Sequence, residues 1–264
     1  MGTNDHRAFH ALHHADRPLV LPNAWDYASA AALAAAGFAA IGTTSLGVAA
    51  AHGLPDAEGW ARAETLALTR RLGRLPCLVT VDVEAGFSDD PAEVADLAAE
   101  LTAAGAVGIN LEDGRPGGTL ADPARQAELI SAVKTRAPGL FVNARVDAHW
   151  LAAEDSPPLG GTLARAERYV AAGADGIFVP GLADDEHIGA LVAAVAAPVN
   201  ILYLPRRHTL RRLTDLGVRR VSTGSLLFRA AVHAAVTVAQ AIRDDQPVPG
   251  EIPGYAEIQR LVAS

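Results

Sequence analysis

Acidic side chains stand at the ends of consecutive apolar segments of this chain, and their types indicate metal chemistry. Asp82 and Glu84 follow one apolar run, and Glu112 follows the next. Residues two apart in a strand face the same side of a sheet, so we expect Asp82 and Glu84 to project together, beside Glu112 from the neighbouring strand. Three carboxylates at one spot repel each other unless a cation lies between them. Because every candidate ligand is an oxygen, the sequence predicts a hard divalent cation.

A basic side chain follows the third apolar segment. Arg145 lies two positions before Asp147, after the run that begins near Leu140. We expect Arg145 to face the anion that the metal holds, and a salt bridge to the carboxylates is the alternative. Asp113 and Asp147 are of a type that often serves as a helix cap or turn residue at a strand end.

The loop after the second expected strand offers small polar groups. Thr44 and Ser45 lie in a glycine-flanked segment, and Asp56 follows after a second glycine, Gly53. Hydroxyl and backbone N–H groups of such a segment can donate to a carboxylate or a phosphate. We expect Asp56 to accept hydrogen bonds in the outer shell of the metal.

These residues need a scaffold that brings several strand ends together. A small-residue helix end, a Gly and an apolar strand recur at residues 35–41, 103–109 and 171–178, with a weaker copy at 216–221. The Gly suits the left-handed position that ends a helix. Strands that are apolar on both faces are typical of a parallel sheet covered by helices. The pattern therefore predicts a repeating βα unit.

Eight strands are expected in all, with helices between them. They begin near Leu19, Phe38, Cys77, Val107, Leu140, Gly176, Val199 and Val218. The 264 residues suit one (β/α)8 barrel, which commonly needs about 250 residues. No Gly-x-Gly-x-x-Gly follows the first strand, which argues against an open dinucleotide-binding sheet. We predict an α/β fold, a single (β/α)8 TIM barrel domain over residues 1–264, which begins with a solvated N-terminal helix and ends with an extra C-terminal helix.

The C-terminal part is expected to lie beyond the closed barrel. Residues 226–242 predict a long helix, residues 246–250 a linker with Pro and Gly, and residues 252–262 a last helix. An extra terminal helix of this kind suits packing on a partner subunit, so residues 226–264 are candidates for exchange between subunits.

Composition narrows the function classes. There are 22 Lys plus Arg and 30 Asp plus Glu, a net charge of −8, so no basic groove for nucleic acid is expected. Lys134 is the only lysine and lies within an expected helix, which excludes a Schiff-base aldolase and a P-loop enzyme. The single Cys77 and the polar N-terminus predict a cytoplasmic protein. The uncharged residues 27–51 are interpreted as a helix–strand pair, so no membrane span is expected.

Several motifs together resemble the isocitrate lyase/phosphoenolpyruvate mutase superfamily. They run in order within residues 20–235: 22–26 (PNAWD), 43–50 (TTSLGVAA), 54–56 (LPD), 81–87 (VDVEAGF), 111–113 (LED) and 144–147 (ARVD). The resemblance implies a (β/α)8 barrel whose last helix is often swapped between subunits of a tetramer. We therefore expect a homo-oligomer, either a dimer or a tetramer.

The resemblance also implies a metal and its ligands. It implies Mg²⁺, with Mn²⁺ as the alternative, held largely through water by Asp82, Glu84 and Glu112, with Asp56 nearby. Arg145 and Asp56 are the catalytic candidates. The family often has Asp at the position of Glu84, and the longer side chain keeps the charge but changes the water shell.

A 2-oxo acid is the ligand that the resemblance implies. Members of the superfamily make or break C–C or P–C bonds beside the enolate of a 2-oxo acid. The candidate substrate contacts are Thr44, Ser45, Leu46, Asp82, Arg145 and Asn200.

The chain departs from the lyase pattern after the LED motif. The lyase branch carries a gating loop there with a catalytic Cys, whereas residues 114–120 read GRPGGTL, with no Cys, His or Lys. The longer Asn-bearing gate of the mutase is also missing. Arg115 and Thr119 are the gate residues able to touch a substrate. Pro180 stands where lyases tend to have a Glu and the mutase a His.

The leading interpretation is a Mg²⁺-dependent lyase that cleaves or decarboxylates a small 2-oxo or 2-hydroxy di- or tricarboxylate through an enolate. A metal ion and an Arg would stabilise the negative charge on the enolate oxygen more than the ground state. The alternatives are a phosphonopyruvate mutase or hydrolase and a non-catalytic 2-oxo acid binding protein.

Overall fold

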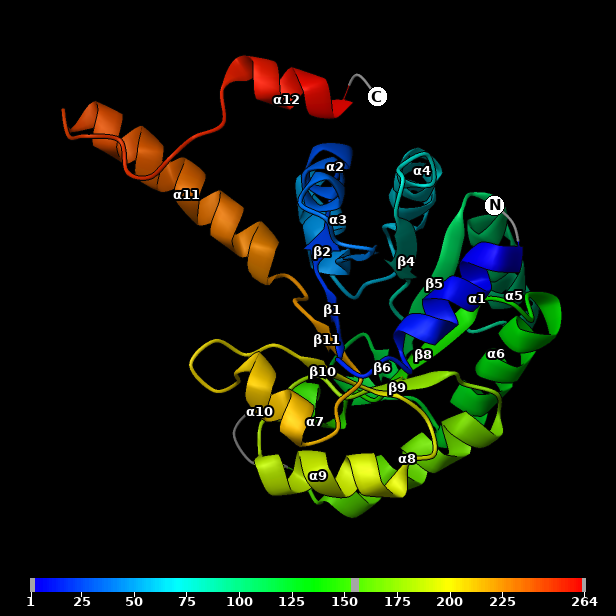
Figure 1. Ribbon diagram of the computed structural model, residues 1–264. Helices are drawn as coiled ribbons and strands as arrows, with labels where there is room; N and C mark the ends of the chain where they lie inside the picture. Colours follow the sequence, from blue (N-terminus) through cyan, green and yellow to red (C-terminus); the bar gives the residue numbers. More distant parts are fainter. Residues whose placement is uncertain (1–2, 153–156, 263–264) are drawn as a thin grey trace.

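Parallel strands form the centre of the molecule, and helices surround them (Figure 1). The computed structural model describes residues 3–152 and 157–262. The nine-stranded sheet has the order β1-β11-β10-β9-β8-β5-β4-β3-β2. Its edges, β1 (Leu19–Leu21) and β2 (Asn23–Ala24), are halves of one stretch of chain around Pro22, which has no N–H for a strand ladder. β1 pairs with β11 and β2 with β3, so the sheet closes and the predicted barrel is confirmed.

The other strands of the barrel match the expected positions. They are β3 (Ala40–Thr43), β4 (Leu78–Asp82), β5 (Ala106–Glu112), β8 (Phe141–Arg145), β9 (Gly176–Phe178), β10 (Val199–Leu202) and β11 (Arg220–Ser222). A small antiparallel hairpin of β6 (Gly114–Arg115) and β7 (Thr119–Leu120) was not expected. Gly117 and Gly118, with φ of 79° and 73°, let the chain reverse between its two strands.

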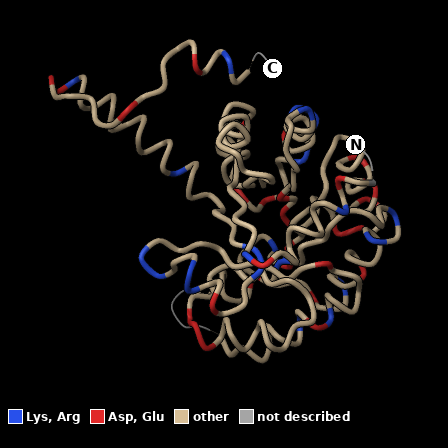
Figure 2. Tube along the Cα trace, in the orientation of Figure 1, with Lys and Arg blue, Asp and Glu red and all other residues tan. Residues whose placement is uncertain are grey.

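Helices cover the outside of the barrel. They are α2 (Tyr27–Ala35), α3 (Ser45–Ala51), α4 (Arg62–Leu72), α5 (Pro91–Ala103), α6 (Pro123–Arg136), α7 (Ala148–Leu151), α8 (Leu159–Ala171), α9 (Asp185–Ala194) and α10 (Leu210–Asp215). Asp90 and Asp122 cap α5 and α6, since each carboxylate accepts a backbone N–H of the first turn. Figure 2 shows acidic and basic residues together at the centre of the barrel, while α2 carries no charge.

The N-terminal helix α1 (Thr3–Leu12) closes one end of the barrel. Phe9 is fully buried and meets Phe141 of β8 edge-on, with 5.4 Å between ring centroids. His13, just beyond the helix, stacks on the same ring at 4.1 Å. A Cβ at Gly108 would come within 2.9 Å of Phe9, so this glycine leaves room for the Phe9 side chain. The expectation of a solvated N-terminal helix is therefore wrong. Phe9 of α1 packs on apolar side chains at the end of the barrel, which would otherwise be exposed to water.

Two helices follow the last strand. α11 (Leu226–Arg243) extends away from the barrel, and α12 (Tyr255–Val262) returns to lie beside α2 (Figure 1). No residue of α11 is buried, and the exposed side chains of Val232, Val236 and Ile242 lie along it. Among the described residues, α11 is the one helix whose length and composition would allow it to cross a membrane.

Candidate active site

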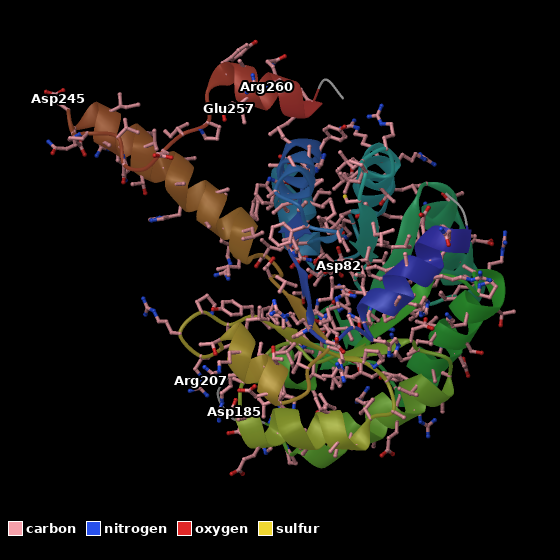
Figure 3. All side chains as sticks on the ribbon, viewed as in Figure 1. Asp82, Asp185, Arg207, Asp245, Glu257 and Arg260 are labelled. Atoms are coloured by element: carbon pink, nitrogen blue, oxygen red, sulfur yellow. The ribbon has the colours of Figure 1, made fainter. Side chains whose placement is uncertain are left out.

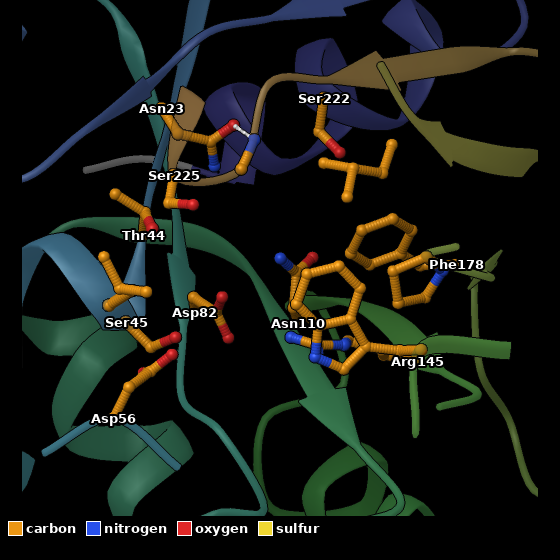
Figure 4. A pocket seen from close by; sticks show the side chains of 15 residues that line it. Asn23, Thr44, Ser45, Asp56, Asp82, Asn110, Arg145, Phe178, Ser222 and Ser225 are labelled. Atoms are coloured by element: carbon orange, nitrogen blue, oxygen red, sulfur yellow. Dashed lines mark hydrogen bonds between the residues drawn. The ribbon is translucent and has the colours of Figure 1, made fainter. Parts of the chain in front are cut away.

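A cavity of about 80 Å³ opens at the carboxyl ends of the strands (Figure 4), where barrels of this type carry their sites. Figure 3 shows Asp82 inside the barrel, whereas Asp185, Arg207, Asp245, Glu257 and Arg260 lie at the periphery. The lining residues come from the strand ends and the loops that follow them: Asn23, Thr44, Ser45, Leu46, Asp56, Asp82, Asn110, Arg145, Trp150, Phe178, Pro180, Leu202, Ser222, Gly224 and Ser225.

Asp82 is the last residue of β4 and faces the cavity together with Asp56 (Figure 4). Its backbone N–H donates to Thr43 Oγ1 at 2.9 Å, which fixes the end of the strand against β3. Burial raises the pKa of the Asp82 carboxyl; Arg145 opposes this shift, and Asp56 adds to it. The cavity therefore holds two carboxylates that repel each other.

Glu84 does not project beside Asp82 as the alternation rule predicted. Strand β4 ends at Asp82, and Glu84 has a left-handed backbone with φ of 51°. Its Oε2 accepts the Gly59 N–H at 2.9 Å, which turns the side chain toward the loop before α4. The residue lines a separate cavity together with residues 57–59, Ala85, residues 87–89, Arg115 and Pro116. Burial is the main cause that raises the pKa of Glu84 to about 7.

Glu112 and Arg145 form a buried ion pair across neighbouring strands. Arg145 Nη1 lies 2.6 Å from Glu112 Oε2, and its Nε donates to Asp147 Oδ1 at 2.6 Å. Burial alone would lower the pKa of Arg145, but Glu112 and Asp147 outweigh it and raise the pKa. Burial raises the pKa of Glu112 despite Arg145. Arg145 thus both lines the cavity and makes the salt bridge that was the alternative.

The three predicted metal ligands do not converge as a direct ligand set. Within residues 3–152 and 157–262, no group of three or more His, Cys, Asp or Glu side chains is placed to hold one ion. Glu84 is turned to Gly59 and Glu112 to Arg145, which leaves Asp82 and Asp56 facing the cavity.

The oxygen donors still fit Mg²⁺ held largely through water. Asp56 Oδ1 and Glu84 Oε1 are buried and have no hydrogen-bond partner in the described part of the chain. Mg²⁺ keeps several waters in most protein sites and binds one or two carboxylates together with a substrate. Asp82 and Asp56 supply that number of carboxylates at the cavity, and every donor is a hard oxygen.

Of the remaining substrate candidates, three line the cavity and one does not. Thr44, Ser45 and Leu46 line the cavity, and the side chain of Thr44 makes no capping hydrogen bond to α3. Asn200 is buried and accepts the Ser222 hydroxyl at 3.2 Å, but it is not one of the described lining residues. It lies among the polar side chains of the barrel interior.

The gate candidates do not reach the cavity in this structure. Arg115 donates to the carbonyls of Glu112 and Gly114 and to Gln126 Oε1, at 3.1, 2.9 and 3.1 Å. Its Nε lies 3.4 Å from Asp89 Oδ1. Thr119 is exposed on β7.

Two lining asparagines were not selected as site residues from the sequence. Asn23 Oδ1 accepts the N–H groups of Thr223 and Gly224 at 3.0 and 2.9 Å, and so ties the first strand to the loop after the last one. Asn110 Oδ1 accepts Asn143 Nδ2 at 2.9 Å. Asn23 stands inside the PNAWD motif, which was a usable signal, whereas Asn110 is recognisable only once the strands are paired.

A second buried arginine lies beneath the cavity. Arg220 of β11 is 0% exposed, and its Nη2 donates to Asn110 Oδ1 at 3.1 Å. Its Nε and Nη1 have no hydrogen-bond partner among the described residues. Burial lowers the pKa of Arg220 to about 9, although Asp82 acts in the opposite direction. No motif or spacing in the sequence singles out this residue.

Asp113 serves the architecture, as one interpretation of its position proposed. It is fully buried and accepts Tyr169 Oη at 2.7 Å and Arg165 Nη1 at 2.9 Å. Its other oxygen accepts the Asp147 N–H at 2.8 Å. Asp113 thereby anchors the turn after β8, which carries Asp147 and α7.

A protein family matches most of the chain. The family described as phosphoenolpyruvate phosphomutase matches residues 9–243. A Mycobacterium tuberculosis (strain ATCC 25618 / H37Rv) protein without an assigned function, Rv1998c, is 47% identical over 97% of this chain and 96% of its own length.

More distant relatives have assigned activities. The 2-methylisocitrate lyase of Halalkalibacterium halodurans is 29% identical over 86% of this chain and 78% of its own length. The oxaloacetate decarboxylase of Pseudomonas savastanoi pv. phaseolicola is 28% identical over 86% of this chain and 81% of its own length.

Solved structures share the fold. A Burkholderia cenocepacia J2315 protein, provisionally described as a phosphonomutase, is 40% identical with a TM-score of 0.85, over 90% of this chain and 99% of its own. A phosphonopyruvate hydrolase solved in complex with oxalate and Mg²⁺ has a TM-score of 0.84 at 24% identity, over 98% of this chain and 95% of its own.

Proposed function

Because the chain belongs to the isocitrate lyase/phosphoenolpyruvate mutase superfamily, we propose that it is a Mg²⁺-dependent lyase acting on a small 2-oxo or 2-hydroxy acid. The bond that breaks is a C–C bond beside an enolate, either by cleavage or by decarboxylation. The observation that carries the proposal is the cavity in which Arg145 stands with Asp56 and Asp82 at the strand ends.

The residues of the chain have separate tasks in this proposal. Arg145 binds the carboxylate or the developing enolate oxygen, because the ion pairs to Glu112 and Asp147 hold its guanidinium in place before substrate arrives. Thr44 and Ser45 offer hydroxyl donors to the acid end of the substrate. Asp82 and Asp56 hold the cation through water. When bound, Mg²⁺ would offset negative charge on the enolate oxygen.

P–C bond chemistry is the second candidate. The matching family carries the description of a phosphomutase, and the 40% identical structure is provisionally described as a phosphonomutase. A phosphonopyruvate mutase or hydrolase would use the same Arg145 and the same metal carboxylates. A non-catalytic 2-oxo acid binding protein is the third candidate, since Arg115 of the gate is turned to Asp89 and Gln126.

Calorimetry with and without Mg²⁺ tests the proposal. The ligands are oxalate, pyruvate, oxaloacetate, 2-oxoglutarate and phosphonopyruvate, and turnover is followed by release of pyruvate or phosphate. We expect Mg²⁺-dependent binding of oxalate and pyruvate and C–C turnover that is lost in Asp82→Asn. Turnover of phosphonopyruvate alone would favour P–C chemistry, and tight binding without any turnover would favour a binding protein. If none of these ligands binds, with or without Mg²⁺, the proposed function is overturned.

We propose further that α11 packs on a second copy of this chain in a dimer or tetramer. Val232, Val236 and Ile242 are 49%, 51% and 66% exposed on a helix that leaves the barrel. Burial of this apolar face against a second copy of the chain would stabilise the oligomer. Light scattering should show an oligomer for the wild type and a smaller species for Val232→Glu/Val236→Glu. A wild-type monomer would contradict the proposal.

A further inference from the structure

Asn110 of β5 lines the cavity between the strands that carry Asp82 and Arg145. The sheet order is β4-β5-β8, and the register pairs Asp82 with Asn110 and Asn110 with Asn143, which stands two residues before Arg145. Figure 4 shows Asn110 among the lining residues beside Asp82. A substrate oxygen shared by the metal at Asp82 and by Arg145 would therefore lie next to the Asn110 amide.

The amide oxygen of Asn110 points into the barrel interior, where two donors meet it. Arg220 Nη2 donates to Asn110 Oδ1 at 3.1 Å, and Asn143 Nδ2 donates to the same oxygen at 2.9 Å. A guanidinium has donors and no acceptor, so the atom that faces it must be the oxygen. The reversed amide would set its NH2 group against both donors. The partners of Asn110 therefore fix its orientation.

The amide nitrogen of Asn110 is left as a free donor at the cavity. No described residue accepts a hydrogen bond from Asn110 Nδ2, and this atom, unlike Asn200 Nδ2, is not closed off from the cavity. An amide nitrogen carries two N–H donors, whereas Mg²⁺ takes oxygen ligands. Because the oxygen is turned to Arg220, Asn110 can serve as a donor to the substrate and not as a ligand of the metal.

The charge of Arg220 lies behind this donor. Arg220 is 0% exposed, and no described carboxylate lies within ion-pair distance of its guanidinium. A cation that donates to the amide oxygen polarises the amide and strengthens its N–H groups as donors, as in a chain of hydrogen bonds. Arg220 therefore makes the Asn110 nitrogen a better donor to negative charge in the cavity, although Arg220 does not line the cavity itself.

We propose that Asn110 is a catalytic residue that donates a hydrogen bond from its amide nitrogen to the enolate oxygen, and that Arg220 is the positioning residue that fixes its orientation. The inference rests on the proposed function, because it adds a donor to the same cavity. In decarboxylation, the electron pair of the breaking C–C bond passes to the 2-oxo oxygen, and CO2 leaves. A donor that is oriented before the step stabilises this new charge without rearrangement.

Calorimetric binding of oxalate in Mg²⁺ tests the role of Asn110 without turnover. Oxalate is planar and places an anionic oxygen where the enolate oxygen forms, so it should detect the donor. Asn110→Leu has a similar size and no N–H donor, and it should bind oxalate about tenfold to a hundredfold more weakly than the wild type. In decarboxylation, kcat should fall by about a hundredfold or more, with a smaller change in KM. Oxalate affinity within about twofold of the wild type in folded Asn110→Leu would overturn the inference.

A matched pair of variants removes the effect of stranding Arg220. Arg220→Met and Asn110→Leu/Arg220→Met both lack the buried charge and differ only at the amide. The double variant should bind oxalate at least about tenfold more weakly than Arg220→Met. Equal oxalate affinity in the two proteins would overturn the role of Asn110, even if Asn110→Leu alone does not fold.

An isosteric variant separates the donor from the fold. Asn110→Asp keeps an oxygen toward Arg220 and replaces the N–H donors by a second oxygen, so it should retain the melting temperature of the wild type and lose oxalate binding. Asn4→Asp is the control, because it adds the same charge to the exposed N-terminal helix α1. An equal change of oxalate affinity in the two variants would overturn the inference.

Rescue by lysine tests the positioning role of Arg220. In Arg220→Met, Asn110 keeps only the bond from Asn143, so oxalate affinity should fall by about threefold or more. Arg220→Lys should restore part of this affinity, because an ammonium also has donors and no acceptor. Wild-type oxalate affinity in Arg220→Met, or a loss that Arg220→Lys does not reduce, would overturn the positioning role.

The outcomes separate this inference from the proposed function. If oxalate binding depends on Asn110 but the wild type turns over phosphonopyruvate alone, the inference stands and the C–C lyase function is overturned. If the wild type and folded Asn110→Leu decarboxylate oxaloacetate equally well with Mg²⁺, the proposed function stands and the inference is overturned. If the wild type binds none of the acids, both are overturned.

Discussion

Two arginines lie in the barrel, and their surroundings are opposite. At the mouth, Arg145 has carboxylate oxygens of Glu112 and Asp147 at 2.6 Å each, and its pKa is raised. In the interior, the guanidinium of Arg220 donates one hydrogen bond among the described residues, to the side-chain oxygen of Asn110, and burial lowers its pKa to about 9.

Arg145 is therefore stabilised by two ion pairs, whereas Arg220 is held mainly by the packing of the barrel interior around it. In a buried ion pair, the attraction between the two charges offsets part of the free energy of desolvation. Removing one partner is destabilising because the other charge stays buried without a partner. Arg145 is in that position. Arg220 has no carboxylate within ion-pair distance among the described residues, so its removal leaves only Asn110, which keeps the bond from Asn143. The mouth should therefore be sensitive to loss of its arginine and the interior tolerant of it.

The largest effect is expected for Arg145→Gln. Loss of the guanidinium should reduce kcat/KM by at least about a hundredfold, because a charged donor aimed at developing negative charge is lost. It should also lower the free energy of unfolding by about 3–5 kcal/mol, because Glu112 and Asp147 keep their charges without a partner. Steady-state kinetics and urea unfolding give the two numbers.

A double variant separates the two effects of Arg145. Glu112→Gln/Arg145→Gln removes one of the stranded carboxylates, so it should recover part of the stability and none of the turnover. Recovery of turnover in the double variant would show that Arg145 acts through folding alone.

Arg220→Met should have the opposite sign on stability. Methionine fills a similar volume without a charge, and it removes the desolvation penalty of a buried ion, which is on the order of several kcal/mol. Two nitrogens of Arg220 have no described hydrogen-bond partner to offset that penalty. We expect the free energy of unfolding to stay the same or to rise, measured as for Arg145→Gln. A loss as large as that of Arg145→Gln would contradict the comparison and make Arg220 an anchor of the barrel.

The same contrast explains what the sequence could and could not predict. The βα repeats placed Asp82, Glu112 and Arg145 at strand ends, because parallel strands of a barrel end at one face. Glu84 was misplaced because the two-residue alternation stops with the strand at Asp82. Arg220 stands in a short strand and resembles a surface residue until the barrel closes around it.

Burial of Phe9 and the pairing of Arg115 could not be predicted for a related reason. Each depends on contacts between segments far apart in the sequence, such as α1 with β8. The pattern of neighbouring residues in the sequence does not predict such contacts. It does predict where strands lie and which residues cap helices.

The smallest effect concerns Glu84, a buried carboxylate just after β4 that neither arginine pairs with. Its pKa is raised from 4.5 to about 7, mainly by burial, so the folded metal-free protein keeps a proton that the unfolded chain loses above about pH 4.5. The free energy of unfolding should therefore fall as pH rises from 4.5 to 7, with a contribution from Glu84 on the order of 1–3 kcal/mol. Glu84→Gln keeps a neutral side chain at every pH, so its thermal stability in chelator should fall less over this range than that of the wild type. Equal pH dependence in both proteins would contradict the raised pKa, because it would show that Glu84 loses its proton as easily in the folded protein as in the unfolded chain.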